Sequence, residues 1–161
     1  MNAGSPQPRQ SKTSPRFPRR GFIVGGVFVL GSVGAARWFN IGARIDDQSL
    51  SAVDALAAVQ AGEITLIDIR RPDEWVSTGV AQGAITIDMR RDDFVTALLA
   101  EPGITKDDPI ALICARGVRS RRLTDRLTEA GFTKIIDVPE GMLGSGAGPG
   151  WLKRGLPVKQ P

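Results

Sequence analysis

The sequence contains no histidine, so none of its 161 residues can serve as an imidazole base for a serine or cysteine nucleophile. It also contains no zinc-binding pattern, no Walker-type phosphate loop and no dinucleotide-binding fingerprint. Its single cysteine, Cys114, has no partner for an intramolecular disulfide. These absences remove several common chemistries and leave the reactivity of one thiol to be explained.

Acidic residues are absent from the first 45 positions, which carry seven lysines and arginines. The remaining residues carry 14 lysines and arginines against 17 aspartates and glutamates. The net charge of +4 therefore divides into +7 for the leader and −3 for the rest of the chain. A mildly acidic domain lacks the basic surface that nucleic-acid binding requires, so we expect no nucleic-acid partner.

Residues 1–20 are rich in proline, serine, glutamine and arginine, a composition that buries too little apolar surface to fold. The pair Arg19 and Arg20 then precedes a glycine, a phenylalanine and a glycine-rich apolar stretch over residues 21–38. This order resembles a twin-arginine export signal. We expect a basic n-region over residues 1–20, a hydrophobic export signal or membrane anchor over 21–38, and a linker over 39–46.

The apolar stretch has two interpretations that the sequence leaves open. As a helix, residues 21–38 would be about 27 Å long, which is marginal against a hydrocarbon core of about 30 Å. The stretch is therefore either a cleaved leader or a retained anchor, and the positive-inside bias gives both the same orientation. We expect the periplasm or cell envelope of a bacterium, the twin-arginine export machinery as a partner, and membrane contact only through the N-terminal segment. The alternative is a cytosolic chain with a disordered basic tail.

Residues 47–161 alternate short apolar runs with amphipathic segments, as is typical of an α/β domain with a parallel sheet. Strands are predicted over residues 64–70, 84–88, 109–114 and 133–138. Helices are predicted from a cap at Ser51 to Gly62, over 92–100 and over 119–130. Active sites of such sheets lie beyond the carboxyl ends of the strands, which is where Cys114 falls.

Cys114 begins a loop between a predicted strand and a predicted helix. The positive end of a helix and nearby cations stabilise a thiolate, which is the reactive form of cysteine. Gly117 would let the chain curl so that successive amides converge on an anion, and Arg116 and Arg119 add charge that cannot titrate away. The expected substrate-binding residues are Ala115, Arg116, Gly117, Val118, Arg119 and Ser120. The alternative is that Cys114 is only a small buried apolar side chain.

Five segments resemble, in order, the rhodanese (thiosulfate sulfurtransferase) family. They are Leu66–Arg70 with Asp73-Glu74-Trp75, Gly83–Ile87, the Cys114 loop, Ile136–Val138 with Glu140-Gly141, and Trp151 with Gly155–Val158. The resemblance covers about residues 47–158. It implies a rhodanese-like domain, with a central parallel sheet flanked by helices and an active-site loop between a strand and a helix.

The spacing within the loop distinguishes between relatives. Four residues separate Cys114 from Arg119, as in the sulfur-transferring members of the family. Cysteine phosphatases place five residues there, and the position that would hold their arginine is Ser120 in this chain. A phosphatase is therefore the weaker enzymatic alternative.

The resemblance implies that Cys114 takes sulfane sulfur from a small anionic donor such as thiosulfate and forms a persulfide. The acceptor would be cyanide, a thiol or another protein, and no metal or organic cofactor is expected. Two other classes remain open: a sulfur carrier that works only with a docked partner, and a non-catalytic binding module.

Two further features each have two interpretations. Asp68 and Arg70 form either an ordinary ion pair that supports a turn, or, as the resemblance suggests, a pair that orients the active-site loop without touching the substrate. The glycine-rich stretch Gly141–Gly150 is either a flexible surface loop or a mobile rim over the Cys114 pocket.

Overall fold

The computed structural model describes Met1 and residues 49–161. The predicted n-region, apolar stretch and linker therefore lie, apart from Met1, outside the described residues. Within the part of the chain that is described, no helix is long and apolar enough to cross a bilayer.

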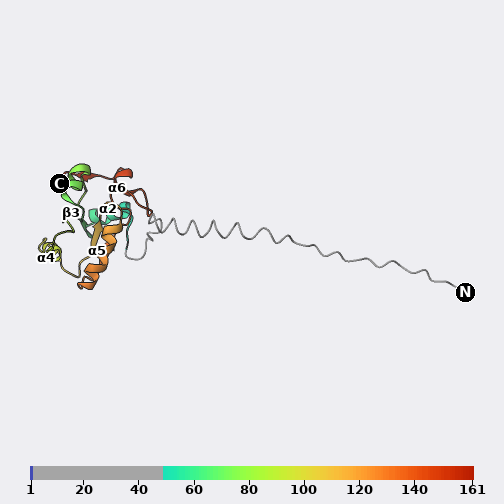
Figure 1. Cartoon of the computed structure of the whole chain (residues 1–161), viewed down its shortest axis with the longest axis horizontal. Helices are drawn as coiled ribbons and strands as arrows, with labels where there is room; N and C mark the ends of the chain where they lie inside the picture. Colours follow the sequence, from blue (N-terminus) through green and yellow to red (C-terminus); the bar gives the residue numbers. More distant parts are fainter. Residues whose placement is uncertain (2–48) are drawn as a thin grey trace. The chain divides into compact units, whose positions relative to one another are not determined.

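Four parallel strands form the central sheet, in the order β3-β1-β4-β5. Figure 1 labels β3, which is one of the two edge strands of this sheet. Their bounds are β1 Thr65–Asp68, β3 Ile85–Thr86, β4 Ile110–Ile113 and β5 Ile135–Asp137. Each strand lies within a predicted one, and the register pairs Ile67 of β1 with both Ile85 and Leu112. The α/β class with a parallel sheet is confirmed.

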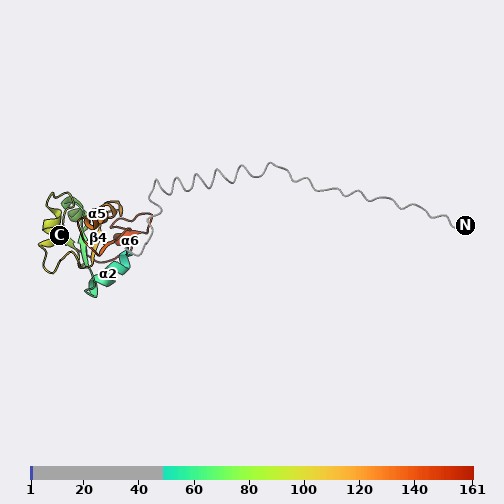
Figure 2. The same ribbon diagram turned by 90° about the horizontal axis from the view of Figure 1, so that it is seen from below.

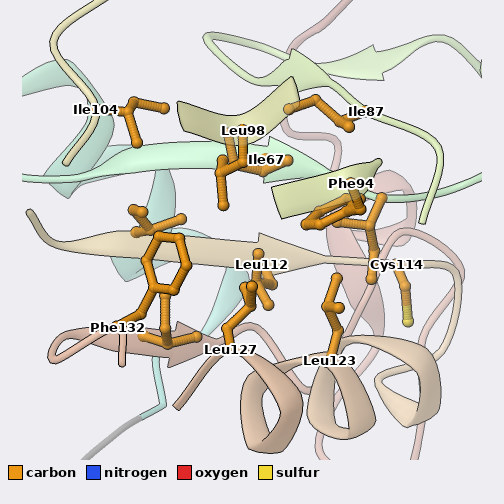
Figure 3. Packing of buried hydrophobic residues seen from close by; sticks show 13 residues of the cluster. Ile67, Ile87, Phe94, Leu98, Ile104, Leu112, Cys114, Leu123, Leu127 and Phe132 are labelled. Carbon is orange, nitrogen blue, oxygen red and sulfur yellow. The ribbon is translucent and has the colours of Figure 1, made fainter. Parts of the chain in front are cut away.

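Helices cover both faces of this sheet. Figure 2 shows β4 between α5 (Val118–Glu129) on one side and α2 (Ala52–Gln60) with α6 (Gly150–Lys153) on the other. The helix α4 (Phe94–Leu99) packs on the α5 side. Because side chains alternate along a strand, Ile67 and Leu112 pack against α4 and α5, while Leu66 and Ala111 face α2 and α6. Figure 3 shows the core on the α5 side, which reaches Cys114.

The predicted helices are confirmed to within two residues at either end. The hydroxyl of Ser51 accepts a hydrogen bond of 3.2 Å from the amide of Asp54 and caps α2, as its sequence indicated. The helix α5 begins directly after Gly117, which has a φ of 76° and lies in the left-handed region. Arg121, Arg122 and Arg126 of this helix are exposed.

Four short elements were not predicted. They are α3 (Pro72–Thr78), β2 (Val80–Ala81), α6, and β6 (Val158–Lys159), which pairs antiparallel with β2. The helix α3 contains no buried residue, so it has no apolar stripe by which its sequence could be recognised. Hydrogen bonds from the preceding strand hold it instead, as described below.

The interpretation of Gly141–Gly150 as a flexible surface loop is wrong for the start of this segment. Gly141, Met142 and Gly144 are buried, and Met142 belongs to the core beneath α2 and α6. The segment contains so many glycines because backbone approaches backbone here: a Cβ on Gly141 would lie 2.6 Å from the carbonyl oxygen of Ala115.

Candidate active site

Cys114 follows the last residue of β4, and three residues separate it from the first residue of α5. Its exposed fraction is only 1%, and its Sγ lies 3.5 Å from the hydroxyl of Ser120 in the first turn of the helix. Figure 3 shows the sulfur just beyond the end of β4, next to that turn. The Ser120 hydroxyl is fully buried and also donates to the carbonyl of Gly117 at 3.2 Å. Ser120 therefore contacts the thiol itself.

The backbone between Cys114 and α5 supplies a row of amide donors. Among the described residues, the amide groups of residues 115–120 donate no hydrogen bond to any protein acceptor. Three of these amides belong to the first turn of α5, where helical geometry leaves N–H groups without partners. The left-handed Gly117 lies in the middle of the row, a conformation that gathers successive N–H groups around an anion. The loop thus has the donors that an anionic sulfur species requires.

Residues 139–143, the segment that follows β5, hold the backbone of this loop in place. The amides of Met142 and Leu143 donate to the carbonyls of Cys114 and Ala115, both at 2.9 Å. A Cβ on Gly117 would collide with the carbonyl of Pro139, so this glycine is required by both its φ and its contact. The carbonyls of the loop are therefore held by the segment, while its amides remain available.

Glu140 ties that segment to the rest of the domain. Its buried carboxylate accepts from the amides of Ala52 at 3.2 Å and Gly150 at 3.0 Å, and from Arg154 at 2.7 and 3.0 Å. Burial raises the pKa of Glu140, but the hydrogen bonds from Arg154, Gly150 and Ala52 outweigh burial and leave this pKa below its usual range. The carboxylate thus remains ionised and joins α2, α6 and the loop support.

Asp68 and Arg70 form a fully buried pair that contacts α3. The guanidinium of Arg70 donates to both oxygens of Asp68 at 2.7 to 3.0 Å. It also donates to Thr78 Oγ1 and to the carbonyl of Gly79, both at 2.7 Å, and to the carbonyl of Glu74 at 3.3 Å. No hydrogen bond or ion pair joins this pair to the Cys114 loop in the described residues. The pair fixes α3, and any influence on the loop passes through that helix.

Glu74 of α3 makes the connection to the loop, a role that its sequence does not predict. Its carboxylate accepts from both terminal nitrogens of Arg119, at 2.6 and 2.7 Å. The only signal in the sequence was its place in the Asp73-Glu74-Trp75 motif. Of the two loop arginines, Arg119 is therefore engaged by a carboxylate from another element.

The Glu74–Arg119 pair shifts both groups toward their charged forms. The hydrogen bond from Arg119 is the largest cause that lowers the pKa of Glu74 to about 2, against an opposing effect of burial. Hydrogen bonding to Glu74 likewise raises the pKa of Arg119, and the interaction with Cys114 contributes in the same direction. Arg119 therefore interacts with both the carboxylate and the thiol.

The remaining loop side chains point to solvent. Arg116 is exposed and forms no ion pair within residues 49–161. Val118 is 43% exposed at the first position of α5. The loop therefore presents one unpaired cation, Arg116, while Arg119 shares its charge with Glu74. Over the same described range, no group of three or more acidic or cysteine side chains is arranged to hold a metal ion.

Comparison with known proteins places this site in a family. A model described as a rhodanese-like domain matches residues 51–144. The chloroplastic thiosulfate sulfurtransferase 16 of Arabidopsis thaliana is 32% identical over 102 residues, which are 58% of this chain and 78% of that protein.

Solved structures show the same fold. The solution structure of a 30 kDa polysulfide-sulfur transferase homodimer from Wolinella succinogenes has a TM-score of 0.55 and 29% identity, over 84% of this chain and 90% of that one. The Alr3790 protein from Anabaena sp. also has a TM-score of 0.55, over 70% of this chain and 82% of that one. At 19% identity, this second likeness bears on the fold alone.

Proposed function

Because the chain belongs to the rhodanese-like domain family, we propose that it is a sulfurtransferase in which Cys114 carries sulfane sulfur from an anionic donor to a thiophilic acceptor. The donor is of the class named for two relatives, thiosulfate or polysulfide. The acceptor is cyanide in the test tube and a thiol or a protein in the cell.

The proposed reaction has two balanced steps. With thiosulfate, the Cys114 thiolate attacks the outer sulfur, a Cys114 S–S bond forms, and the bond to the sulfonate sulfur breaks with its electron pair leaving on sulfite. The acceptor then attacks the outer sulfur of the persulfide, and the electron pair of that S–S bond returns to Cys114. With cyanide the product is thiocyanate. No proton transfer is needed when the thiol is already ionised, in keeping with a chain that has no histidine.

One observation carries the proposal: six consecutive amides, of residues 115–120, have no acceptor among the described residues and lie beside the only cysteine of the sequence. Such donors stabilise negative charge on the thiolate, on the donor and on the persulfide, and they need no rearrangement during the reaction. The Ser120 hydroxyl, whose proton goes to the Gly117 carbonyl, lies 3.5 Å from the sulfur. Arg116 supplies the exposed charge that attracts an anionic donor.

The test is thiocyanate production from thiosulfate and cyanide by the full chain, with Cys114→Ser measured in parallel. We expect turnover in the wild type and at least a 1,000-fold loss in the variant, because serine cannot form the persulfide. Polysulfide replaces thiosulfate in a second arm. A folded wild type with no turnover on either donor contradicts the proposal.

A partner-dependent carrier remains as the second candidate, because the thiol of this chain is only 1% exposed. Such a protein would form the persulfide but release it slowly to small acceptors. Mass spectrometry after incubation with the donor separates the two candidates. A stable gain of one sulfur atom without thiocyanate indicates a carrier, whereas no gain indicates a binding module.

We further propose that the segment before the domain directs export through the twin-arginine route. The support is the order of residues alone: Arg19 and Arg20, one spacer, a phenylalanine and an apolar stretch of moderate hydropathy. Replacing both arginines with lysine in a bacterial host with and without the twin-arginine translocase tests this. Equal export in all cases contradicts the proposal.

A further inference from the structure

The guanidinium of Arg119 has its two terminal nitrogens occupied. An arginine recognises a tetrahedral oxyanion best through two parallel N–H bonds, which is the geometry it also uses with carboxylates. Here that geometry is taken by Glu74, whose oxygens lie 2.6 and 2.7 Å from the terminal nitrogens of Arg119. Glu74 thus stands where the oxygens of a phosphate or sulfonate group would bind.

Glu74 is held in this position by its own helix. Its Oε2 accepts a hydrogen bond of 3.0 Å from the amide of Arg71 at the start of α3. The helix is fixed in turn by Arg70, which donates to Thr78 and to the carbonyl of Gly79 at its other end. A carboxylate fixed by a backbone amide on an anchored helix loses little further freedom in pairing with Arg119, so its competition with a free anion is strong.

The charge of Glu74 is also constant over the working range of pH. Its pKa of about 2 keeps the carboxylate ionised at every pH at which a thiolate is present. An entering dianion would have to displace this carboxylate and would also meet its negative charge at short range.

From this geometry we propose that Glu74 is a specificity-determining residue that prevents tetrahedral oxyanions from binding to the Arg119 guanidinium. The proposal rests on the proposed function in taking the Cys114 loop as the anion site. It implies that the loop binds its donor through the amides of residues 115–120 and Arg116, so that thiosulfate, itself a tetrahedral anion, gains no contact from Arg119, while a linear polysulfide has none to lose. A loop that contains an arginine is thereby protected from inhibition by phosphate and sulfate.

The test measures binding of inorganic phosphate to the full chain by calorimetric titration, in a Cys114→Ser background where no chemistry occurs. We expect Glu74→Gln to lower the dissociation constant for phosphate at least tenfold. Asp73→Asn is the matched control, because Asp73 is the preceding residue of α3, is exposed, and pairs with Arg71 rather than with Arg119. It removes the same charge without freeing the guanidinium, and we expect a change of less than twofold.

Adding Arg119→Met to the Glu74→Gln variant should return the dissociation constant to the starting value. If Glu74→Gln does not fold, Glu74→Asp keeps the charge but withdraws the carboxylate by one methylene, and we expect at least a threefold gain. A Glu74 variant that folds and binds phosphate no better than Asp73→Asn overturns the proposal, as does a gain that survives Arg119→Met. Because the binding assay does not use Cys114, absence of sulfurtransferase turnover would not alter its result.

Discussion

Two Asp-x-Arg triplets follow neighbouring parallel strands, and their local geometry is nearly the same. In Asp68-Ile69-Arg70, the arginine amide donates to the aspartate at 3.1 Å, and its Nε and Nη2 donate at 2.9 and 2.7 Å. In Asp88-Met89-Arg90, the corresponding distances are 3.0, 3.0 and 2.6 Å. Three residues of sequence are thus enough to make the pair, whichever strand precedes it.

The surroundings of the two triplets differ in every respect that affects their energy. The side chain of Arg70 is 1% exposed and donates three further hydrogen bonds to α3 and Gly79, whereas that of Arg90 is 63% exposed and, within residues 49–161, donates hydrogen bonds to Asp88 alone. A buried pair that loses one partner leaves an uncompensated charge, while an exposed pair is solvated by water. The comparison shows that the contribution of an ion pair to stability depends on its burial and on its other hydrogen bonds. The three-residue motif alone does not reveal this contribution.

The largest effect is expected for Arg70→Ala. Removing this guanidinium leaves the carboxylate of Asp68 buried without a counter-ion and frees α3, at a cost of about 3–5 kcal/mol in the free energy of unfolding. Urea unfolding followed by circular dichroism measures the loss. The double variant Asp68→Ala with Arg70→Met removes both charges and should recover part of it. A loss below about 1 kcal/mol would mean that the two triplets are equivalent after all.

An intermediate effect is expected for Glu74→Gln under acid. Glu74 has an exposed fraction of 19%, and its pKa in the folded protein is about 2 against an ordinary 4.5. The stabilisation from its ionised form is therefore complete above about pH 5 and is lost as the pH falls toward 2. After screening by solvent, this amounts to on the order of 1 kcal/mol.

The measurement is urea unfolding of both proteins at several pH values. The difference in unfolding free energy between wild type and Glu74→Gln should be constant above pH 5 and should shrink as the pH falls toward 2. A difference that is independent of pH over this range would show that the Glu74 charge does not contribute to stability.

The smallest effect is expected for Arg90→Ala. Asp88 has a lowered pKa, caused mainly by its hydrogen bond to Arg90, but solvent can replace that partner. The melting temperature should remain within experimental error of the wild type, and α3 should be undisturbed. A clear decrease would mean that the exposed triplet supports structure that the buried one does not.

The strands, the helix after Cys114 and the loop between them could be predicted, because each has a signal that is local in sequence. Apolar runs predict β1 and β4, and Gly117 marks the turn into α5. The helix α3 could not be predicted, since none of its side chains is fully buried and Arg70 holds it by donating to the carbonyls of Glu74 and of Gly79, the residue that follows it.

The partner of Arg119 could not be predicted for a different reason. Glu74 is 45 positions away, and nothing in the sequence distinguishes it from Asp73 beside it. The structure of the stretch after Glu140 could not be predicted, because a high glycine content usually indicates freedom of movement. Here it permits close contact between backbones, as at Gly141 and Ala115.

The buried carboxylate of Glu140 has a consequence for the order in which the domain is completed during synthesis. Its partners are Ala52 near the beginning of the domain and Gly150 and Arg154 near its end. These hydrogen bonds can form only when both parts of the domain are present, since Ala52 and Glu140 are 88 positions apart. A nascent chain that has not yet extended to Arg154 would have to bury Glu140 without its counter-ion. We therefore expect the Cys114 loop, which depends on the same segment, to acquire its final shape only after Arg154 has emerged. The position of the thiol in the chain thus does not set the moment at which its site is complete.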